Sequence, residues 1–187
     1  MLNGMFFPLD EKPPIYLGGY YTKYDNKAYS ACFRRYFAIE SVTMDSEIKI
    51  TNPRVSCAVH VRRGDLAKTD DYFYGKVSVE YFVKSMHYIK QRFPEVKFYF
   101  FSDEMEWVEE NLIDFCKESK YDFELVKGNK AYKDLMLIAS CDHSIASQGS
   151  AGKFGAMMNG KGLLLVSNDS HEIEWTQKYE NTVVIDI

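Results

Sequence analysis

Cysteine is scarce in this chain, and its spacing excludes the common zinc sites. The 187 residues include four cysteines, at positions 32, 57, 116 and 141, and none forms a CxxC pair, the spacing typical of zinc modules. Cys57 and Cys141 lie in apolar runs. We therefore expect reduced core thiols rather than a disulfide framework, and a reducing compartment.

Long apolar runs are also missing. No stretch of the sequence reaches the length of a transmembrane helix. Residues 1–14 lack the basic start and the continuous apolar core of a secretory signal peptide, and Pro8, Pro13 and Pro14 interrupt any helix there. These absences predict a cytoplasmic protein.

An excess of positive charge is absent too. The chain has 23 basic and 27 acidic residues, a formal net charge of −4, which argues against a broad nucleic-acid or membrane-surface binder. A local basic cluster in such a chain fits a small anionic ligand better. With 46% hydrophobic and 16% aromatic residues, a chain of this length is expected to fold as one globular domain.

Hydrophobic periodicity from residue 55 onward predicts strands that alternate with helices. Strands are expected at 55–61, 96–101, 123–126, 144–146, 163–166 and 183–185, and helices at 78–93, 105–119, 131–140 and 150–159. Ser78 is placed to cap the first of these helices, and Gly160 to close the last. The alternation predicts an α/β fold, doubly wound, with a mostly parallel sheet and helices on both faces.

Three polar clusters follow predicted strands, and ligands of such folds bind at the carboxyl ends of the strands. The first cluster, residues 60–65, reads His-Val-Arg-Arg-Gly-Asp. Arg62 and Arg63 carry forks of donors that suit phosphate oxygens. Gly64 allows a sharp turn or a close approach to a ligand. This cluster predicts a site for a doubly charged phosphate ester.

The second cluster consists of Ser102, Asp103 and Glu104, directly after the predicted strand 96–101. Its two carboxylates are expected either to cap the following helix and complement its dipole or to bind a sugar hydroxyl or ribose. As a metal site the pair alone is weak, because no third ligand follows at helical spacing.

The third cluster, residues 147–153, is rich in small residues and leads into the predicted helix 150–159. Backbone N–H groups and the helix dipole attract anions at such a start. Ser150 is expected to cap the helix or bind a phosphate oxygen, and Lys153 to add positive charge. The simpler alternative is an ordinary capped helix start. A Walker P-loop is excluded, because neither the glycine spacing nor the residue after the lysine fits.

Asp134 stands inside the apolar segment 131–140. It is expected either to face solvent in the first helical turn or to accept a bidentate hydrogen bond from a guanine base. His87, His143 and His171 have no partner at ligand spacing, and we interpret them as structural or exposed. No Ser-His-Asp or Cys-His arrangement is indicated.

Several stretches of the chain match, in order and spacing, the motifs of one enzyme family. Residues 60–65 match H-x-R-R-x-D, residues 100–107 resemble F-S-D-D-x-x-W, and residues 133–141 resemble D-L-x-L-M-x-x-C. Residues 147–159 stand in place of N-S-T-F-S-W-W-G-A-W-L-N, and residues 19–21 resemble the start of G-Y-x-Q-S. Over roughly residues 15–187 the chain therefore resembles the α-1,2-fucosyltransferases (glycosyltransferase family 11), relatives of the α-1,6- and protein O-fucosyltransferases.

The resemblance implies an inverting fucosyltransferase that uses GDP-fucose and requires no metal, with the Rossmann-like C-terminal half of a GT-B fold. By this resemblance Arg62 and Arg63 would hold the diphosphate and stabilise the leaving GDP. Asp65 would be a candidate base, although orienting the arginines is its simpler role. The other donor-binding residues that the resemblance implies are His60, Ser102, Asp103, Asp134 (at guanine), Ser150, Gly152 and Lys153.

The implied partners are a nucleotide-sugar donor and a carbohydrate acceptor, often a galactoside, and no nucleic acid. Peripheral association with a membrane through the acceptor is compatible with such a reaction. The motifs leave the identity of the acceptor and the oligomeric state open.

Two departures from the family pattern set the expected domain organisation. Residues 148–154 replace N-S-T-F-S-W-W, so both tryptophans are gone, and the G-G-L-G-N-Q-M-F-Q segment of the family's N-terminal half is absent. We expect residues 1–54 to be an irregular or helical remnant of that half, or a link to it, and residues 55–187 to be a nucleotide-sugar-binding α/β domain. The alternatives to an active enzyme are a truncated, non-catalytic GDP-sugar-binding or interaction domain and, more weakly, an unrelated α/β phosphate-ester binder.

Overall fold

A computed structural model describes residues 54–64, 78–168, 176 and 179–187. Most of the segment 1–54, including the 19–21 motif, therefore lies outside the described residues, as do Asp65 and His171. The described strands are β1 (Ser56–Val61), β2 (Lys97–Ser102), β3 (Asp122–Leu125), β4 (His143–Ala146), β5 (Leu164–Ser167) and β6 (Thr182–Ile185). The helices are α3 (Val79–Arg92), α4 (Met105–Asn111), α5 (Ile113–Glu118), α6 (Ala131–Ser140) and α7 (Ser150–Asn159).

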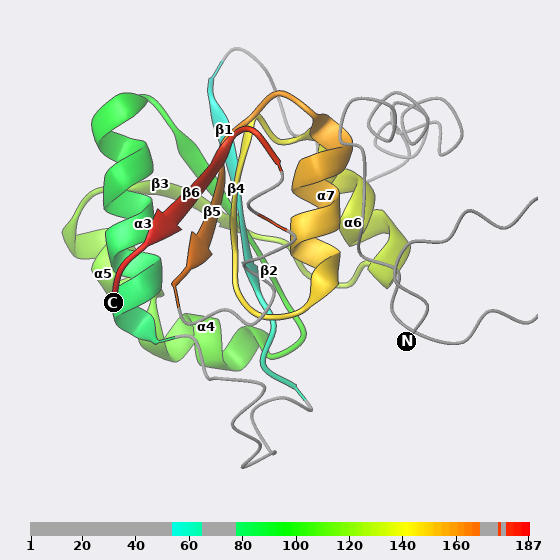
Figure 1. The fold of residues 1–187 in the computed structure, drawn as a ribbon. Coiled ribbons are helices and arrows are strands. Elements are labelled where there is room, and N and C mark those ends of the chain that lie inside the picture. The colour runs from blue at the N-terminus through cyan, green and yellow to red at the C-terminus, as the bar shows by residue number, and fades with distance from the viewer. Residues whose placement is uncertain (1–53, 65–77, 169–175, 177–178) are drawn as a thin grey trace, which may run out of the picture.

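The strands form one parallel sheet in the order β3-β2-β1-β4-β5-β6. In Figure 1, α3, α4 and α5 lie on one face and α6 and α7 on the other. The predicted doubly wound α/β fold is confirmed. The chain builds outward from β1 to β3 and then returns to place β4 on the other side of β1. This reversal creates a switch point between β1 and β4, where open α/β sheets bind ligands.

Alternation along β1 explains why both faces of the sheet are covered. Cys57, Val59 and Val61 are fully buried in the core cluster that includes α3, α4 and α5, whereas Ala58 packs in a second cluster with α6. Successive residues of a strand point to opposite faces, so a nearly continuous apolar run is needed to bury the strand on both. Cys57, Cys116 and Cys141 are buried free thiols, which confirms the prediction of reduced core residues for Cys57 and Cys141.

Local signals account for the limits of α3. The Ser78 hydroxyl accepts a hydrogen bond from the Tyr81 N–H at 3.2 Å, which satisfies one of the free donors of the first turn. Glu80 and Lys84 pair at 2.7 Å one turn apart.

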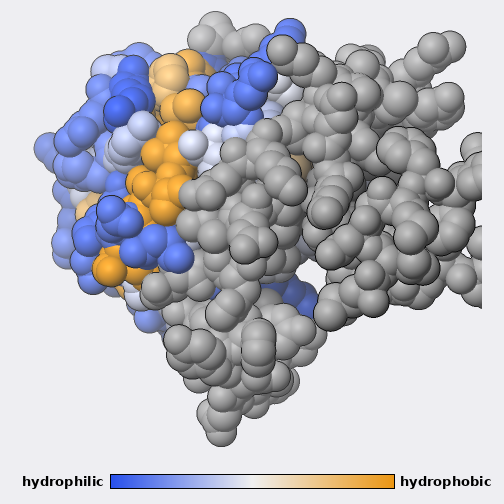
Figure 2. All heavy atoms as spheres, in the orientation of Figure 1, coloured by the Kyte–Doolittle hydropathy of each residue, from blue (hydrophilic) through white to orange (hydrophobic). Residues whose placement is uncertain are grey.

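Figure 2 shows hydrophilic residues over the side of the molecule that carries α3 and an apolar stripe along the edge strand β6. Within the described part of the chain, no helix is long and apolar enough to cross a membrane.

The predicted helix 105–119 is wrong in one respect, because the structure divides it into α4 and α5 at Leu112. The Asn111 side chain donates to the Trp107 carbonyl at 2.8 Å and so competes with the backbone ladder at that carbonyl. Leu112 is nevertheless fully buried, so the break keeps the apolar stripe in the core. The other predicted elements agree with the structure within one residue at each end.

Candidate functional site

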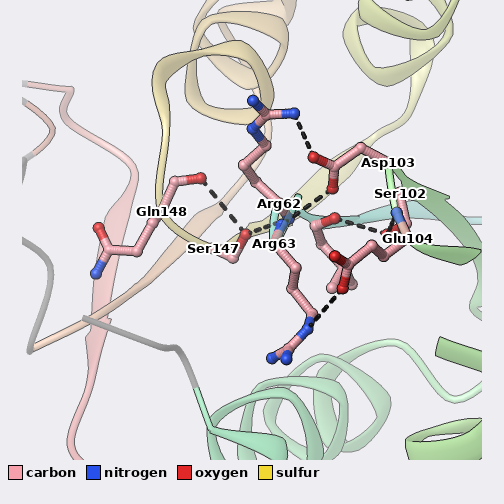
Figure 3. Close-up of polar contacts among 8 residues, drawn as sticks. Arg62, Arg63, Ser102, Asp103, Glu104, Ser147 and Gln148 are labelled. Atoms are coloured by element: carbon pink, nitrogen blue, oxygen red, sulfur yellow. Dashed lines mark hydrogen bonds and ion pairs between the residues drawn. The ribbon is translucent and has the colours of Figure 1, made fainter. Parts of the chain in front are cut away.

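The carboxyl ends of β1, β2 and β4 are joined by short hydrogen bonds (Figure 3). The Ser147 hydroxyl, after β4, accepts from the Arg62 N–H at 2.7 Å, and the Ser147 N–H donates to the His60 carbonyl at 3.1 Å. The Ser102 hydroxyl donates to the Val61 carbonyl at 2.8 Å. The three polar clusters therefore meet at one edge of the sheet, as their order predicts.

Arg62 lies at the switch point between β1 and β4. Its Nη1 forms an ion pair with Oδ2 of Asp103. A Cβ atom at Gly149 would lie 3.3 Å from Arg62 Cγ, and Gly149 has φ +86°, so the loop before α7 and the arginine stem pack closely. The Arg62 side chain is 38% exposed, which leaves it open to an anion in solution.

Arg63 points the other way, and Figure 3 shows the two guanidinium groups diverging. Its guanidinium carbon lies 4.2 Å from the centroid of the Trp107 ring, and its Nε donates to Glu104 at 3.3 Å. A cation over an indole face and beside a carboxylate is held in one direction. The structure therefore does not bring the two guanidinium groups together as one clamp. The contact of Trp107 with Arg63 was not predicted, although the ring stands in the 100–107 motif.

The Asp103 carboxylate contacts both arginines at this edge of the sheet. Its Oδ1 accepts from the Arg63 N–H at 3.0 Å, while its Oδ2 pairs with Arg62. A Cβ at Gly64 would collide with the same carboxylate, so the close approach expected of this glycine is made by Asp103.

The expectation that Asp103 and Glu104 cap the next helix is wrong. Glu104 is the N-cap residue of α4 but makes no side-chain cap hydrogen bond. Both carboxylates instead pair with arginines, because a full positive charge attracts a carboxylate more strongly than a helix end does. In the described residues no three His, Cys, Asp or Glu side chains are grouped as metal ligands.

His60 sits on the strand beneath α7. Its Nδ1 is buried without a hydrogen-bond partner among the described residues, and a Cβ at Gly152 would lie 2.6 Å from the ring. Burial lowers the pKa of His60 from 6.5 to about 4; Asp103 opposes this, whereas Arg62 and Lys153 add to it. The imidazole is therefore neutral at neutral pH.

The start of α7 differs from the expected cap. Gly149, not Ser150, is the N-cap residue, and no side chain caps the helix. The positive φ of Gly149 aims the chain into the helix in a conformation that serine adopts at a cost, so Ser150 becomes the first helical residue and is exposed. The first N–H groups of this ten-residue helix are consequently free of a side-chain cap. Lys153 is fully buried rather than exposed to solvent.

Asp134 lies in the first turn of α6, but it does not simply face solvent. Its Oδ1 is buried without a hydrogen-bond partner among the described residues. Burial raises the pKa of the carboxyl, and the neighbouring Asn129 amide lowers it in part. Asn129 was not predicted as a neighbour of Asp134, and only its position just before the helix could have indicated it.

Two of the remaining histidines have the structural roles predicted for them. His143 stacks on Phe93 with ring centroids 4.2 Å apart, and its Nδ1 accepts from the Leu163 N–H at 3.0 Å. His87 is exposed, with its Nδ1 3.0 Å from the Tyr121 hydroxyl. Neither lies in the cluster around Arg62.

Comparisons with known proteins show which family the chain resembles. The sequence profile of glycosyl transferase family 11 matches residues 3–184. An alpha-1,2-colitosyltransferase of Escherichia coli is 27% identical over 64% of this chain and 41% of its own length.

Two mammalian proteins are also similar. Galactoside alpha-(1,2)-fucosyltransferase 2 of Pongo pygmaeus is 24% identical over 65% of this chain and 36% of its own length. Galactoside 2-alpha-L-fucosyltransferase Sec1 of Mus musculus is 23% identical over 65% of this chain and 33% of its own length. The chain thus matches about two fifths or less of each relative. Because the family profile covers nearly its whole length, the chain belongs to glycosyl transferase family 11.

Proposed function

We propose that the protein is a fucosyltransferase that moves fucose from GDP-fucose to a hydroxyl group of a carbohydrate, often a galactoside, with inversion at the anomeric carbon. The observation that carries the proposal is the position of Arg62. A partly exposed guanidinium stands at the β1/β4 switch point, beside the glycine that opens the uncapped helix α7. Charge and helix dipole there favour a phosphate.

The two arginines have different roles in this proposal. Arg62 contacts the diphosphate and, by displacing Asp103, exchanges one anionic partner for another. Arg63 stays on Trp107 and Glu104 and fixes the turn that carries Arg62. Ser150, as the first residue of α7, presents its hydroxyl and N–H groups to the same phosphates. Neutral His60 adds a hydrogen-bonding group without adding charge.

The reaction is a displacement at the anomeric carbon. The acceptor hydroxyl oxygen forms a bond to that carbon as the bond to the β-phosphate oxygen breaks, and the electron pair leaves with GDP. The hydroxyl proton passes to a base, for which Asp65 remains the candidate from the sequence. Arg62 and the α7 N–H groups stabilise the charge that develops on the phosphate, which makes departure of GDP easier.

Asp134 would bind the base of the donor. A carboxylate accepts two hydrogen bonds from the adjacent N1–H and N2–H groups of guanine, and the buried Oδ1 has a free lone pair for one of them. No metal takes part in the proposed step.

Two further candidates rest on the comparisons. The colitosyltransferase relative favours GDP-colitose as an alternative donor. The coverage of about two fifths or less of each relative favours a non-catalytic GDP-sugar-binding or interaction domain as the alternative to an enzyme.

A transfer assay distinguishes these candidates. The protein is incubated with GDP-fucose or GDP-colitose and a galactoside, and released GDP and glycosylated product are measured together. We expect equal amounts of both with one donor, and loss of both in Arg62→Ala. If the protein bound GDP but released none from either donor, the result would support the non-catalytic domain. The absence of any GDP binding would overturn the proposal and this alternative together.

A further inference from the structure

The sheet ends in two edge strands, β3 and β6, which differ in charge. The β3 edge carries Asp122 and Glu124, whose carboxylates pair with Arg54 and Lys97 at 2.6 and 2.7 Å. Charged side chains on an edge strand discourage pairing with another strand. β6 reads Thr-Val-Val-Ile, without a charged residue or a proline, and an apolar stripe runs along it (Figure 2). The β6 edge therefore lacks the protection that the β3 edge has.

The hydrogen bonds to β5 show which backbone groups of β6 point outward. The carbonyls of Asn181 and Ile185 accept from N–H groups of β5 and the residue after it, at 3.0 and 3.1 Å. Alternate residues of a strand direct their backbone groups to opposite sides. Thr182, Val184 and Asp186 therefore direct theirs away from the sheet.

Two contacts within the chain close this outward row at its ends. The Thr182 N–H donates to the Tyr179 carbonyl at 3.0 Å, and the Asp186 carbonyl accepts from Lys84 Nζ at 3.1 Å. Between them, the Thr182 carbonyl, both Val184 groups and the Asp186 N–H have no hydrogen-bond partner among the described residues. Their order along the strand is acceptor, donor, acceptor, donor. Run antiparallel, this order is complementary to itself.

We propose that β6 is an interface between two copies of this chain, joined antiparallel about a twofold axis at Val184. The two Val184 residues exchange a pair of hydrogen bonds, and each Asp186 N–H donates to the Thr182 carbonyl of the other copy. One continuous sheet then runs through both molecules. Because such an isologous contact uses the same patch on both copies, it closes at a dimer.

The surroundings of β6 fit this pairing. Val183 packs in the core cluster of α3 and Val184 in that of α7, so the joined edges would cover valine side chains on both faces of the sheet. On α3, the exposed Glu80 and Lys84 carry opposite charges, and a second α3 in antiparallel orientation would therefore meet no net repulsion. A contact along the side of the sheet also leaves the carboxyl ends of β1, β2 and β4 open to a ligand.

Analytical ultracentrifugation over a range of protein concentrations tests the proposal. We expect the wild type to dimerise. Asp186→Pro removes an outward N–H at an exposed position, and symmetry doubles the loss to two hydrogen bonds, so the dissociation constant of the dimer should rise about tenfold or more. Asp186→Ala is the matched control. It keeps the N–H and should leave the dissociation constant unchanged.

Cysteine cross-linking tests the register of the two strands. The two Val184 Cα atoms would face each other as a hydrogen-bonded pair, about 5.5 Å apart, which is within the range of a disulfide. Val184→Cys should therefore give a disulfide-linked dimer with a mild oxidant such as diamide, and peptide mapping should identify the bond. Thr182→Cys should not, because Thr182 faces Asp186 of the other copy. The wild type under the same oxidant gives the background from its own cysteines.

Three results would each overturn the proposal. The first is a wild type that stays monomeric at every concentration. The second is a dimer that is equally stable in Asp186→Pro, and the third is cross-linking of Thr182→Cys as efficient as that of Val184→Cys, because either would place the contact elsewhere. If circular dichroism shows that Asp186→Pro does not fold, the two cysteine variants decide, and a Val184→Cys protein that forms no linked dimer overturns the proposal.

Discussion

At the scale of single residues, burial shifts His60 and Asp134 towards their neutral forms. The imidazole loses affinity for a proton and the carboxyl gains it, because both would otherwise carry a charge with little solvent around it. Among the residues that the structure describes, one buried atom of each side chain also has no hydrogen-bond partner. Buried charged groups of this kind lower the stability of the free fold, and the proposed binding of the donor would account for their presence.

For His60 we predict a loss of stability in acid. The pKa of about 4 in the folded state lies below the ordinary 6.5, so the unfolded chain takes up the proton first. The stability of the wild type relative to His60→Gln should therefore be greatest above pH 6.5 and decrease towards pH 4, by on the order of 1–3 kcal/mol for a pKa shift of this size. Urea denaturation at several pH values measures this difference in the free energy of unfolding. The exposed control His87→Gln should show no such difference, and equal behaviour of the two variants would contradict the assignment.

For Asp134 we predict the opposite dependence of folding stability on pH, a loss of stability as the pH rises. Its pKa is raised in the folded state, so the folded protein binds the proton more tightly and ionisation destabilises it as the pH rises. Asp134→Asn should therefore raise the melting temperature of the ligand-free protein at pH 7, with a gain that shrinks on acidification, while it weakens GDP binding. Asp114→Asn, at a carboxylate with a 79% exposed side chain, is the control. A lower melting temperature in Asp134→Asn would contradict this prediction.

At the scale of elements, α4 fixes the direction of Arg63. The Trp107 ring lies under the guanidinium and packs on Phe82 of α3 with centroids 6.3 Å apart, so the ring is itself held by the core. The turn after β1 is thereby tied to a helix rather than left to its own flexibility.

We predict that Trp107→Leu weakens GDP binding several-fold, because a cation–π contact of about 0.5–2 kcal/mol no longer fixes that turn. Trp107→Phe should lose less, since it keeps an aromatic face. Calorimetry measures the affinity. Phe115→Leu removes a ring that contacts Tyr121 at 5.5 Å and should lower stability without changing GDP affinity. Equal GDP affinities in Trp107→Leu and Phe115→Leu would show that the ring does not act through Arg63.

The contact between α6 and α7 depends on a glycine. A Cβ at Gly155 would lie 2.5 Å from Ile138 Cγ2, too close for two well-packed helices. We predict that Gly155→Ala lowers the free energy of unfolding by about 1–3 kcal/mol through overpacking, measured by urea denaturation. Ala151→Ser, at an exposed position of the same helix, should change it by less than ~0.5 kcal/mol. A neutral Gly155→Ala would contradict the close packing.

Local signals in the sequence were sufficient for some elements and not for others. The start of α3 and the end of α7 were predictable, because Ser78 caps the first and Gly160 closes the second. The break at Leu112 depends on the Asn111 side chain. The shift of the α7 cap to Gly149 depends on the path of the backbone after β4. The partners of Asp103 and Glu104 were not predictable either, because they lie about 40 residues away in the sequence.

At the scale of the whole molecule, the sheet order makes the site. Arg62 and Ser147 are 85 positions apart and become neighbours only because β4 returns to the free side of β1. The order of motifs along the chain predicts a shared edge. It does not predict that the guanidinium groups of Arg62 and Arg63 diverge, because their directions depend on the positions of the carboxylates with which they pair.

The central claim is that Arg62 binds the diphosphate of a guanine nucleotide, and the most direct test compares GDP with GMP by calorimetry. The wild type should bind GDP more tightly than GMP, Arg62→Ala should lose this preference, and Arg92→Ala should keep it, because Arg92 lies over the Tyr88 ring at 3.5 Å. Retention of the GDP preference in Arg62→Ala, or equal affinity of the wild type for GDP and GMP, would contradict the account.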